Sequence, residues 1–164
     1  MPRSRVPVNR NLADDEAWIS IFLFKPHVLT TKLCSTMKAY ILMGSESDMP
    51  HAEKIAEGLK AEGVDFEYFV RSAHKDPVGV YNYVKAHDDE TKVLFITIAG
   101  RSNALSGVVA ANAKKPVLAC PPFKDKLDFL VNINSTLQMP SKTPVLTVLE
   151  PSNCALAAAR ILSL

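Results

Sequence analysis

The chain has 164 residues, of which 48% are hydrophobic and 22% are charged, so it can form one globular domain with a sizeable core. Its formal net charge is only +2, and no dense stripe of Lys or Arg occurs, which argues against a nucleic-acid partner. The longest apolar run near the start, residues 18–24, is far shorter than the roughly 20 residues that span a bilayer, so we expect no membrane partner.

The cysteine usage indicates a reducing compartment. Cys34, Cys120 and Cys154 are an odd number and show no CxxC spacing, which excludes a disulfide framework and a zinc cluster. Acidic residues stand directly before the early apolar run, unlike in a secretory signal or an organelle transit peptide. We therefore predict a cytoplasmic protein. No metal-ligand spacing such as HxxxH or HExxH occurs, so no metal site is expected.

Residues 1–36 differ from the rest of the chain. They are polar and irregular or lack a steady period, and a strand-like run begins abruptly after Met37. The remainder, residues 37–164, is long enough for a complete small α/β domain. We expect residues 1–36 to be an N-terminal extension that is disordered or reflects a start codon assigned too far upstream, and residues 37–164 to form the functional domain.

From Met37 onward, apolar strand-like runs alternate with stretches of helical spacing. The first helical stretch has Pro50 in its first turn and Gly63 as its stop, whereas Gly107 weakens the third. The predicted order is strand 38–43, helix 49–63, strand 64–70, helix 77–90, strand 92–100, helix 104–115, strand 116–122, helix 126–139, strand 144–150 and helix 152–164. Ser152 or Asn153 is expected to cap the last helix.

This alternation predicts an α/β fold of three layers, α/β/α. Strands with little polar alternation, separated by helices, are typical of a parallel sheet covered on both faces. About five strands favour the flavodoxin-like, doubly wound order, whose ligands bind beyond the carboxyl ends of the strands. The last helix is apolar nearly all round, so we expect it to pack against another subunit; the alternative is docking in its own core.

The loop after the first strand, residues 43–49, is a candidate phosphate and ribose site. Gly44 permits a sharp turn, and two serines with free backbone N–H groups at a helix start make a plausible phosphate cradle. Asp48 is suited to binding a ribose diol. In the structural alternative, Ser47 or Asp48 simply caps the following helix.

The loop after the second strand, residues 71–77, reads RSAHKDP. His74 can transfer a proton near neutral pH, and Arg71 and Lys75 can hold an anion. The other histidines serve as comparisons: His51 and His87 lie in helical stretches among polar neighbours, so we expect both at the surface.

The loop after the third strand, residues 99–107, is rich in small residues and offers a cation and two hydrogen-bonding side chains, Arg101, Ser102 and Asn103. Such a loop can press its backbone against a ligand. The structural alternative is a turn in which Ser102 or Asn103 caps the next helix.

Three of these loops together, GSESDM, SAHKDP and AGRSNALSG, followed by ACPP, resemble the PurE family of aminoimidazole ribonucleotide carboxylases. The resemblance covers nearly all of residues 37–164. Lys75 after His74, and a third loop without histidine, resemble the family's second class, which uses CO2 directly. The other class is a mutase with a SAHR-type second loop and an AGGAAHLPG-type third loop.

The resemblance implies a role for each matching position. His74 would transfer the proton; Ser45 and Asp48 would contact the ribose phosphate, and Ser47 and Lys75 the phosphate end. Arg101, Ser102 and Asn103 would shape the pocket for CO2 and the carboxylate, with backbone N–H groups near Gly107. The full set of implied substrate-binding residues is Gly44, Ser45, Ser47, Asp48, Ser72, Lys75, Gly100, Arg101, Ser102, Asn103 and Gly107.

The family chemistry implies carboxylation of 5-aminoimidazole ribonucleotide without ATP, metal or other cofactor. The resemblance also implies a homo-oligomer, an octamer, with active sites between subunits. Three alternatives stay open: the carboxyaminoimidazole ribonucleotide mutase, a non-catalytic flavodoxin-like binding module, and an inactive relative. The last rests on residues 1–36 and on Lys142, which replaces a glycine usual in the family's Met-Pro-Ser-Gly turn.

Overall fold

Five parallel strands form one sheet in the computed structural model, which describes residues 36–164. The elements are β1 (Lys38–Met43), η1 (Glu46–Asp48), α1 (Met49–Ala61), β2 (Asp65–Val70), α2 (Pro77–His87), β3 (Val93–Ile98), α3 (Ala104–Asn112), β4 (Val117–Ala119), α4 (Lys126–Leu137), β5 (Leu146–Thr147) and α5 (Pro151–Leu162). The predicted alternation of strands and helices is confirmed. Apart from Thr36, the predicted N-terminal extension lies outside the described residues, as do Cys34 and the early apolar run.

The strand order is β2-β1-β3-β4-β5, with all pairs parallel. This is the flavodoxin-like order, so the predicted doubly wound sheet is confirmed. The chain moves outward from β1 to β2 and then returns to the other side of β1 to form β3. The topological switch therefore lies between β1 and β3, whose carboxyl ends are level at the pair Met43 and Ile98.

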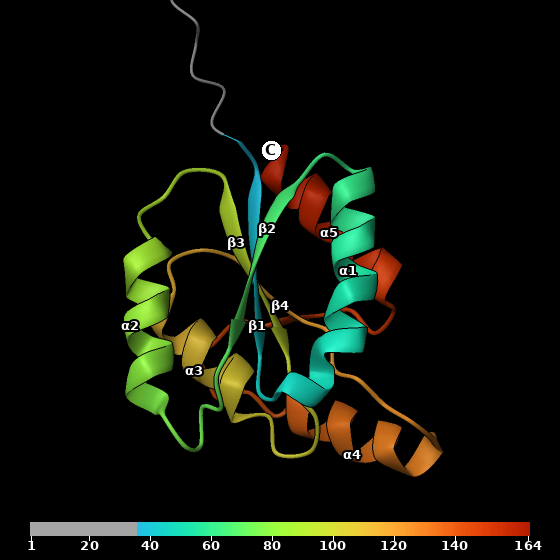
Figure 1. The fold of residues 1–164 in the computed structure, drawn as a ribbon. Helices are drawn as coiled ribbons and strands as arrows, with labels where there is room; N and C mark the ends of the chain where they lie inside the picture. The colour runs from blue at the N-terminus through green and yellow to red at the C-terminus, as the bar shows by residue number, and fades with distance from the viewer. Residues whose placement is uncertain (1–35) are drawn as a thin grey trace, which may run out of the picture. The chain divides into compact units, whose positions relative to one another are not determined.

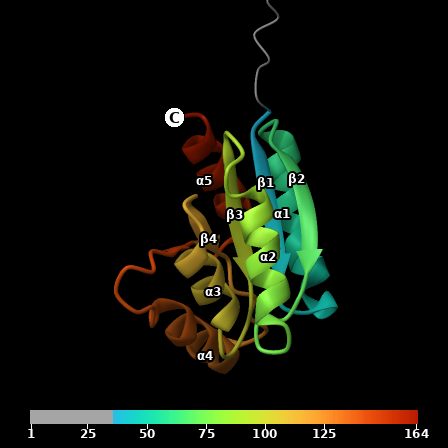
Figure 2. The same ribbon diagram turned by 90° about the vertical axis from the view of Figure 1, so that its left-hand side faces the viewer.

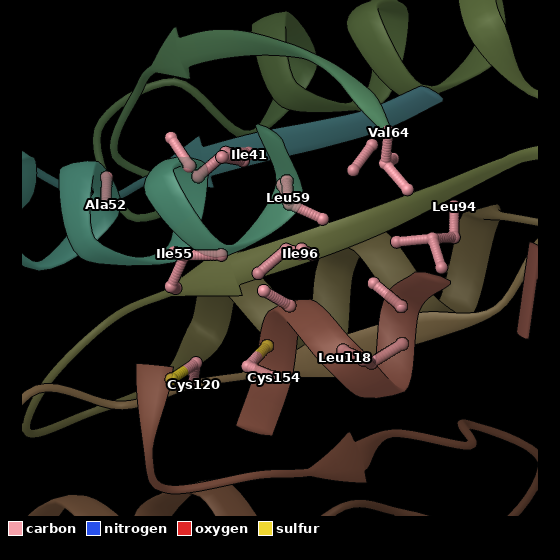
Figure 3. Packing of buried hydrophobic residues seen from close by; sticks show 14 of the residues in the cluster. Ile41, Ala52, Ile55, Leu59, Val64, Leu94, Ile96, Leu118, Cys120 and Cys154 are labelled. Carbon is pink, nitrogen blue, oxygen red and sulfur yellow. The ribbon is translucent and has the colours of Figure 1, made fainter. Parts of the chain in front are cut away.

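Alternate residues of the central strands build two separate cores, one on each face of the sheet. Ile41 and Met43 of β1 belong to the cluster beneath α1 and α5, whereas Tyr40 and Leu42 belong to the cluster beneath α2 and α3. This is the two-residue period of a strand, used on both faces. Figure 1 shows the three layers that result, and Figure 3 shows the core beneath α1 and α5 from close by.

The last helix, α5, docks in its own domain. It packs along α1 and buries Cys154, Ala158 and Leu162, while Arg160 is exposed. The helix is therefore not buried on every side by its own chain, and it docks in its own core as the alternative expected, whereas its packing against another subunit stays a prediction. The predicted cap is also wrong: the N-cap is Glu150, whose side chain accepts a hydrogen bond from the Asn153 N–H at 3.0 Å.

The strands at the β4–β5 side of the sheet are shorter than predicted. We expected residues 116–122 and 144–150, but β4 has three residues and β5 has two. Proline has no N–H to donate to a neighbouring strand, and Pro116, Pro121 and Pro144 all flank these strands. A short edge strand also offers little unpaired backbone to other chains.

Helix α4 lies beyond the carboxyl ends of the strands, as Figures 1 and 2 both show. It buries only two residues, Asn132 and Thr136, and both are polar. The loops after β1, β2 and β3 begin at this same edge of the sheet, so α4 lies beside them (Figures 1 and 2). Among residues 36–164, no helix is both long and apolar enough to cross a membrane.

Candidate active site

The loop after β1 is a tight turn whose carboxylate, that of Asp48, does not cap the following helix. The Ser45 hydroxyl oxygen accepts hydrogen bonds from the Ser47 N–H at 3.3 Å and from the Ser47 hydroxyl at 3.0 Å. Asp48 precedes α1, but its side chain makes no capping hydrogen bond. The structural alternative for Asp48 is therefore wrong, and its carboxylate remains available to a ligand. Partial burial raises the pKa of this carboxyl above its ordinary value, against the opposing effect of a backbone hydrogen bond with Ser45.

The loop after β2 presents His74 on a closed turn. The N–H groups of Lys75 and Asp76 both donate to the Ser72 carbonyl, at 3.2 and 2.9 Å. Asp76 caps α2 by accepting from the Gly79 N–H at 2.8 Å, and its other carboxylate oxygen pairs with Arg71 at 2.6 Å. The pair of Arg71 and Asp76 thus joins the two ends of the loop, while the imidazole of His74 is exposed.

The loop after β3 faces His74. The Ser102 hydroxyl lies 3.5 Å from the His74 Nε2 atom, which joins the second and third loops. Arg101 has a φ of +49°, the left-handed region in which a residue with a side chain is strained. Asn103 caps α3, accepting from the Ser106 N–H at 3.1 Å.

These three loops line one cavity of about 440 Å³ at the topological switch. Eight of the eleven predicted substrate-binding residues surround it, together with His74, the predicted proton-transfer residue. The eight are Gly44, Ser45, Ser47, Asp48, Ser72, Gly100, Arg101 and Ser102. The cavity volume is within the range usual for small-ligand sites. The positions of the loops and the family resemblance therefore indicated most of the residues that line this cavity, and their roles stay predictions.

Three predicted residues do not line this cavity. Asn103 is buried, and its side chain is engaged as a helix cap, as the structural alternative expected. Gly107 lies inside α3, where an added Cβ would meet the Met139 sulfur at 3.6 Å. Lys75 is exposed on the second loop next to His74. The structure therefore brings neither Asn103 nor Gly107 into the cavity, and it leaves Lys75 outside.

The cavity also contains residues that the sequence reasoning did not single out. Phe123 and Lys124 come from the loop after β4, and Asp128 and Asn132 come from α4. Of this region the sequence singled out only the ACPP run before this loop, and no motif distinguished Lys124. Asn132 gives no sequence signal, because one asparagine in a helical stretch looks like any surface residue.

His51 and His87 are half-buried, contrary to the expectation of surface positions, and His27, also expected at the surface, lies outside the described residues. The Nε2 atom of His51 lies 3.3 Å from the Cys120 sulfur. The ring of His87 lies 4.2 Å from that of Tyr40, and its Nδ1 atom lies 2.6 Å from a Glu90 oxygen. Within residues 36–164, His74 is thus the single histidine that lines the cavity.

A second, wider cavity of about 850 Å³ runs along α4 on the other side of Arg101. It shares Arg101, Ser102 and Asp128 with the first cavity but contains no residue of the loops after β1 and β2. Because it lacks His74 and Asp48, we assign the chemistry to the smaller cavity. Among residues 36–164, no group of His, Cys, Asp and Glu could hold a metal ion.

Comparisons with known proteins bear on this site. A family model described as AIR carboxylase matches residues 38–164. Over 128 residues the chain is 48% identical to phosphoribosylaminoimidazole carboxylase of Archaeoglobus fulgidus. This match covers 78% of this chain and 70% of the relative. It is 45% identical over 126 residues to N5-carboxyaminoimidazole ribonucleotide mutase of Methanocaldococcus jannaschii, covering 76% and 78%.

A solved structure is similar as well. The crystal structure of Treponema denticola PurE superposes with a TM-score of 0.71 at 47% sequence identity. The match covers 77% of this chain and 80% of that chain. The likeness in fold and in sequence therefore extends over the same part of the chain as the family model.

Proposed function

The chain belongs to the AIR carboxylase family, and on that premise we propose that its smaller cavity converts 5-aminoimidazole ribonucleotide and CO2 into 4-carboxy-5-aminoimidazole ribonucleotide. The reaction is a step of purine biosynthesis, needs no ATP, and makes the protein a carboxy-lyase. The observation that carries this proposal is the convergence of His74, Asp48 and Ser102, from three different strand ends, on one cavity.

The substrate's ribose phosphate is the part that the first loop suits. The hydroxyls of Ser45 and Ser47 and the carboxylate of Asp48 line the cavity wall opposite α4. Hydroxyls can donate to phosphate oxygens, and a free carboxylate can accept from a ribose diol. Lys75 and Lys124 supply cations at the same edge of the sheet, and we propose both as phosphate ligands.

Carbon–carbon bond formation needs positioning more than activation. Carbon 4 of the substrate is enamine-like, so its electron pair attacks the carbon of CO2, and one C=O pair becomes a carboxylate. Arg101 and Ser102 line the cavity where this negative charge develops, and fixed donors there stabilise it.

Proton removal completes the reaction. The tetrahedral carbon 4 loses its proton to the His74 imidazole, and the C–H electron pair restores the aromatic ring. Histidine suits this role because an imidazole can both accept and donate a proton near neutral pH. The Ser102 hydroxyl, 3.5 Å from Nε2, is placed to orient the imidazole.

The mutase is the second candidate, favoured by the relative from Methanocaldococcus jannaschii. A mutase would move the carboxylate from the carbamate nitrogen to carbon 4 within the site. An assay with the ribonucleotide plus bicarbonate, run beside an assay with the carbamate isomer, separates the two. We expect product from the first; turnover of the carbamate alone would establish the mutase instead.

Replacement of His74 tests the proton-transfer role. Because its side chain is exposed, His74→Asn should fold normally and lower kcat by a factor of about 10² to 10⁴. His87→Asn, which changes a half-buried histidine outside the cavity, is the control and should keep wild-type kcat. Undiminished activity in His74→Asn would contradict the assignment.

We also propose a homo-oligomer, an octamer, in the cytoplasm. The exposed apolar residues of α4 beside the wider cavity support a subunit contact there. Cys120 and Cys154 are free thiols, which suits a reducing compartment. Residues 37–164 would form the catalytic domain, in keeping with the extent of the family match.

A further inference from the structure

Helix α4 has its polarity reversed. A surface helix normally buries an apolar stripe and exposes its polar face. Here the two buried side chains are Asn132, 2% exposed, and Thr136, 1% exposed. Leu127, at 73%, and Leu137, at 63%, point to solvent instead. Since burial of polar groups is favourable only when they are hydrogen-bonded, the partners of these side chains show what the buried face is for.

Apart from one bond within α4, those partners belong to the loops after β3 and β4, which line the active-site cavity. The Asn132 side chain accepts a hydrogen bond from the Arg101 N–H and donates one to the Pro122 carbonyl at 2.6 Å. It therefore binds the loops after β3 and β4 to each other. The Thr136 hydroxyl accepts from the Asn103 side-chain amide at 3.0 Å and donates to the Asn132 carbonyl at 2.8 Å.

One further bond extends this polar seam, which we define as Asn132, Ser135 and Thr136. The Ser135 hydroxyl oxygen accepts from the Asn103 N–H at 2.6 Å. The three seam residues are spaced i, i+3 and i+4, so they share one helix face. Side chains of α4 thus hold two backbone N–H groups of the third loop, those of Arg101 and Asn103.

The seam acts where the backbone is strained. A left-handed residue other than glycine costs about 1–3 kcal/mol and persists only where its surroundings determine it. Arg101 is such a residue, and its N–H is the group that Asn132 binds. Gly100 permits the approach, since an added Cβ there would lie 3.2 Å from the Asn132 amide nitrogen.

We propose that Asn132 is a positioning residue for the carboxylation, an inference that rests on the function proposed above. By fixing the Arg101 backbone it sets the direction of Arg101 and Ser102, and Ser102 in turn contacts His74. A misplacement of about 1 Å at such a site can lower a rate about 100-fold. Asn132 thereby acts on the reacting groups through the third loop.

Asn132→Ala in the full chain is the test. We expect kcat to fall about 10- to 100-fold and the KM for CO2 to rise, while the KM for the ribonucleotide changes less than about threefold, because the first loop still binds the ribose phosphate. Asn132→Asp keeps an acceptor for the Arg101 N–H but loses the donor to the Pro122 carbonyl, so it should recover only part of the lost kcat. Asn112→Ala removes a comparable bond, to the Val108 carbonyl, far from the loop and should leave kcat unchanged.

The outcomes separate this inference from the proposed function. An inactive wild type would overturn both. An active wild type with unchanged kcat in folded Asn132→Ala would overturn the positioning role alone, since a merely structural Asn132 would lower Tm without altering kcat. If circular dichroism shows that Asn132→Ala does not fold, Ser135→Ala provides the milder test, because it removes one half-buried bond. A severalfold fall in kcat supports the seam, and unchanged kcat there overturns it.

Discussion

At the scale of single residues, two residues with a left-handed backbone conformation differ in their surroundings, since one lines the cavity and the other lies in an exposed turn. Arg101 and Lys142 have φ values of +49° and +64°, and both would be easier for glycine. Arg101 lines the cavity, so its strain accompanies a chemical role. Lys142 occupies an exposed turn closed by a hydrogen bond from the Thr143 N–H to the Pro140 carbonyl at 3.3 Å. The family resemblance expected glycine at this position, and the backbone explains why.

We predict that Lys142→Gly stabilises the protein. The left-handed conformation costs a residue with a Cβ about 1–2 kcal/mol, and glycine loses roughly half of that gain through its more flexible unfolded chain. The free energy of unfolding should therefore rise by about 0.5–1 kcal/mol, seen as a higher urea midpoint with an unchanged m-value. Lys142→Ala retains the Cβ and should show no such rise. Equal stability of the two variants would contradict this account.

At the scale of elements, the contact between α1 and α5 depends on a missing side chain. Gly58 lies inside α1, where alanine normally stabilises a helix by about 1 kcal/mol. A Cβ at Gly58, however, would lie 2.6 Å from the Ala155 Cβ on α5, well inside contact distance. We therefore predict that Gly58→Ala lowers the free energy of unfolding by about 1–3 kcal/mol.

Urea denaturation of two further variants checks that alanine at position 58 destabilises the protein instead of stabilising α1. Gly58→Ala combined with Ala155→Gly removes the clash and should recover part of the loss, as expected for residues in contact. Gly107→Ala, in the interior of α3, meets only an ordinary contact at 3.6 Å and should not destabilise. If Gly58→Ala were as stable as the wild type, the close helix contact would be disproved.

The sequence predicts those features that depend on neighbouring residues, and not those that depend on contacts between distant parts of the chain. The order of strands and helices was predictable because apolar residues recur with a fixed period within each element. Tyr40 and Ile41, for example, are neighbours in β1 and belong to opposite cores. The three loops were predictable because strand ends meet at one edge. The cap at Glu150 and the role of Asn132 were not, because both depend on partners that only the folded chain brings close.

At the scale of the whole molecule, α4 joins two surfaces. Its inner seam binds the loops of the cavity, and its outer face exposes leucines beside the wider cavity. A subunit that covered the outer face would bury these leucines and hold the seam in place. Assembly and the geometry around Arg101 would then depend on the same helix, which accounts for a helix that contributes so little to its own core.

The corresponding prediction concerns assembly. Leu130 is 54% exposed in the middle of α4, and Leu130→Glu keeps a good helix former while placing a charge in the proposed contact. Light scattering should give a mass well above that of one chain for the wild type and a smaller mass for this variant. Because the seam loses its support, kcat should fall together with the mass.

Leu164→Glu changes a fully exposed leucine at the end of the chain and should alter neither mass nor kcat. Three results would contradict the prediction in different ways. A monomeric wild type would remove the oligomer itself. A Leu130→Glu protein with the wild-type mass would instead show that the subunits meet elsewhere, and the exposed leucines of α4 would then need another partner. A Leu130→Glu protein that dissociates yet keeps the wild-type kcat would support the subunit contact on α4. It would show, however, that the geometry of the third loop does not depend on assembly.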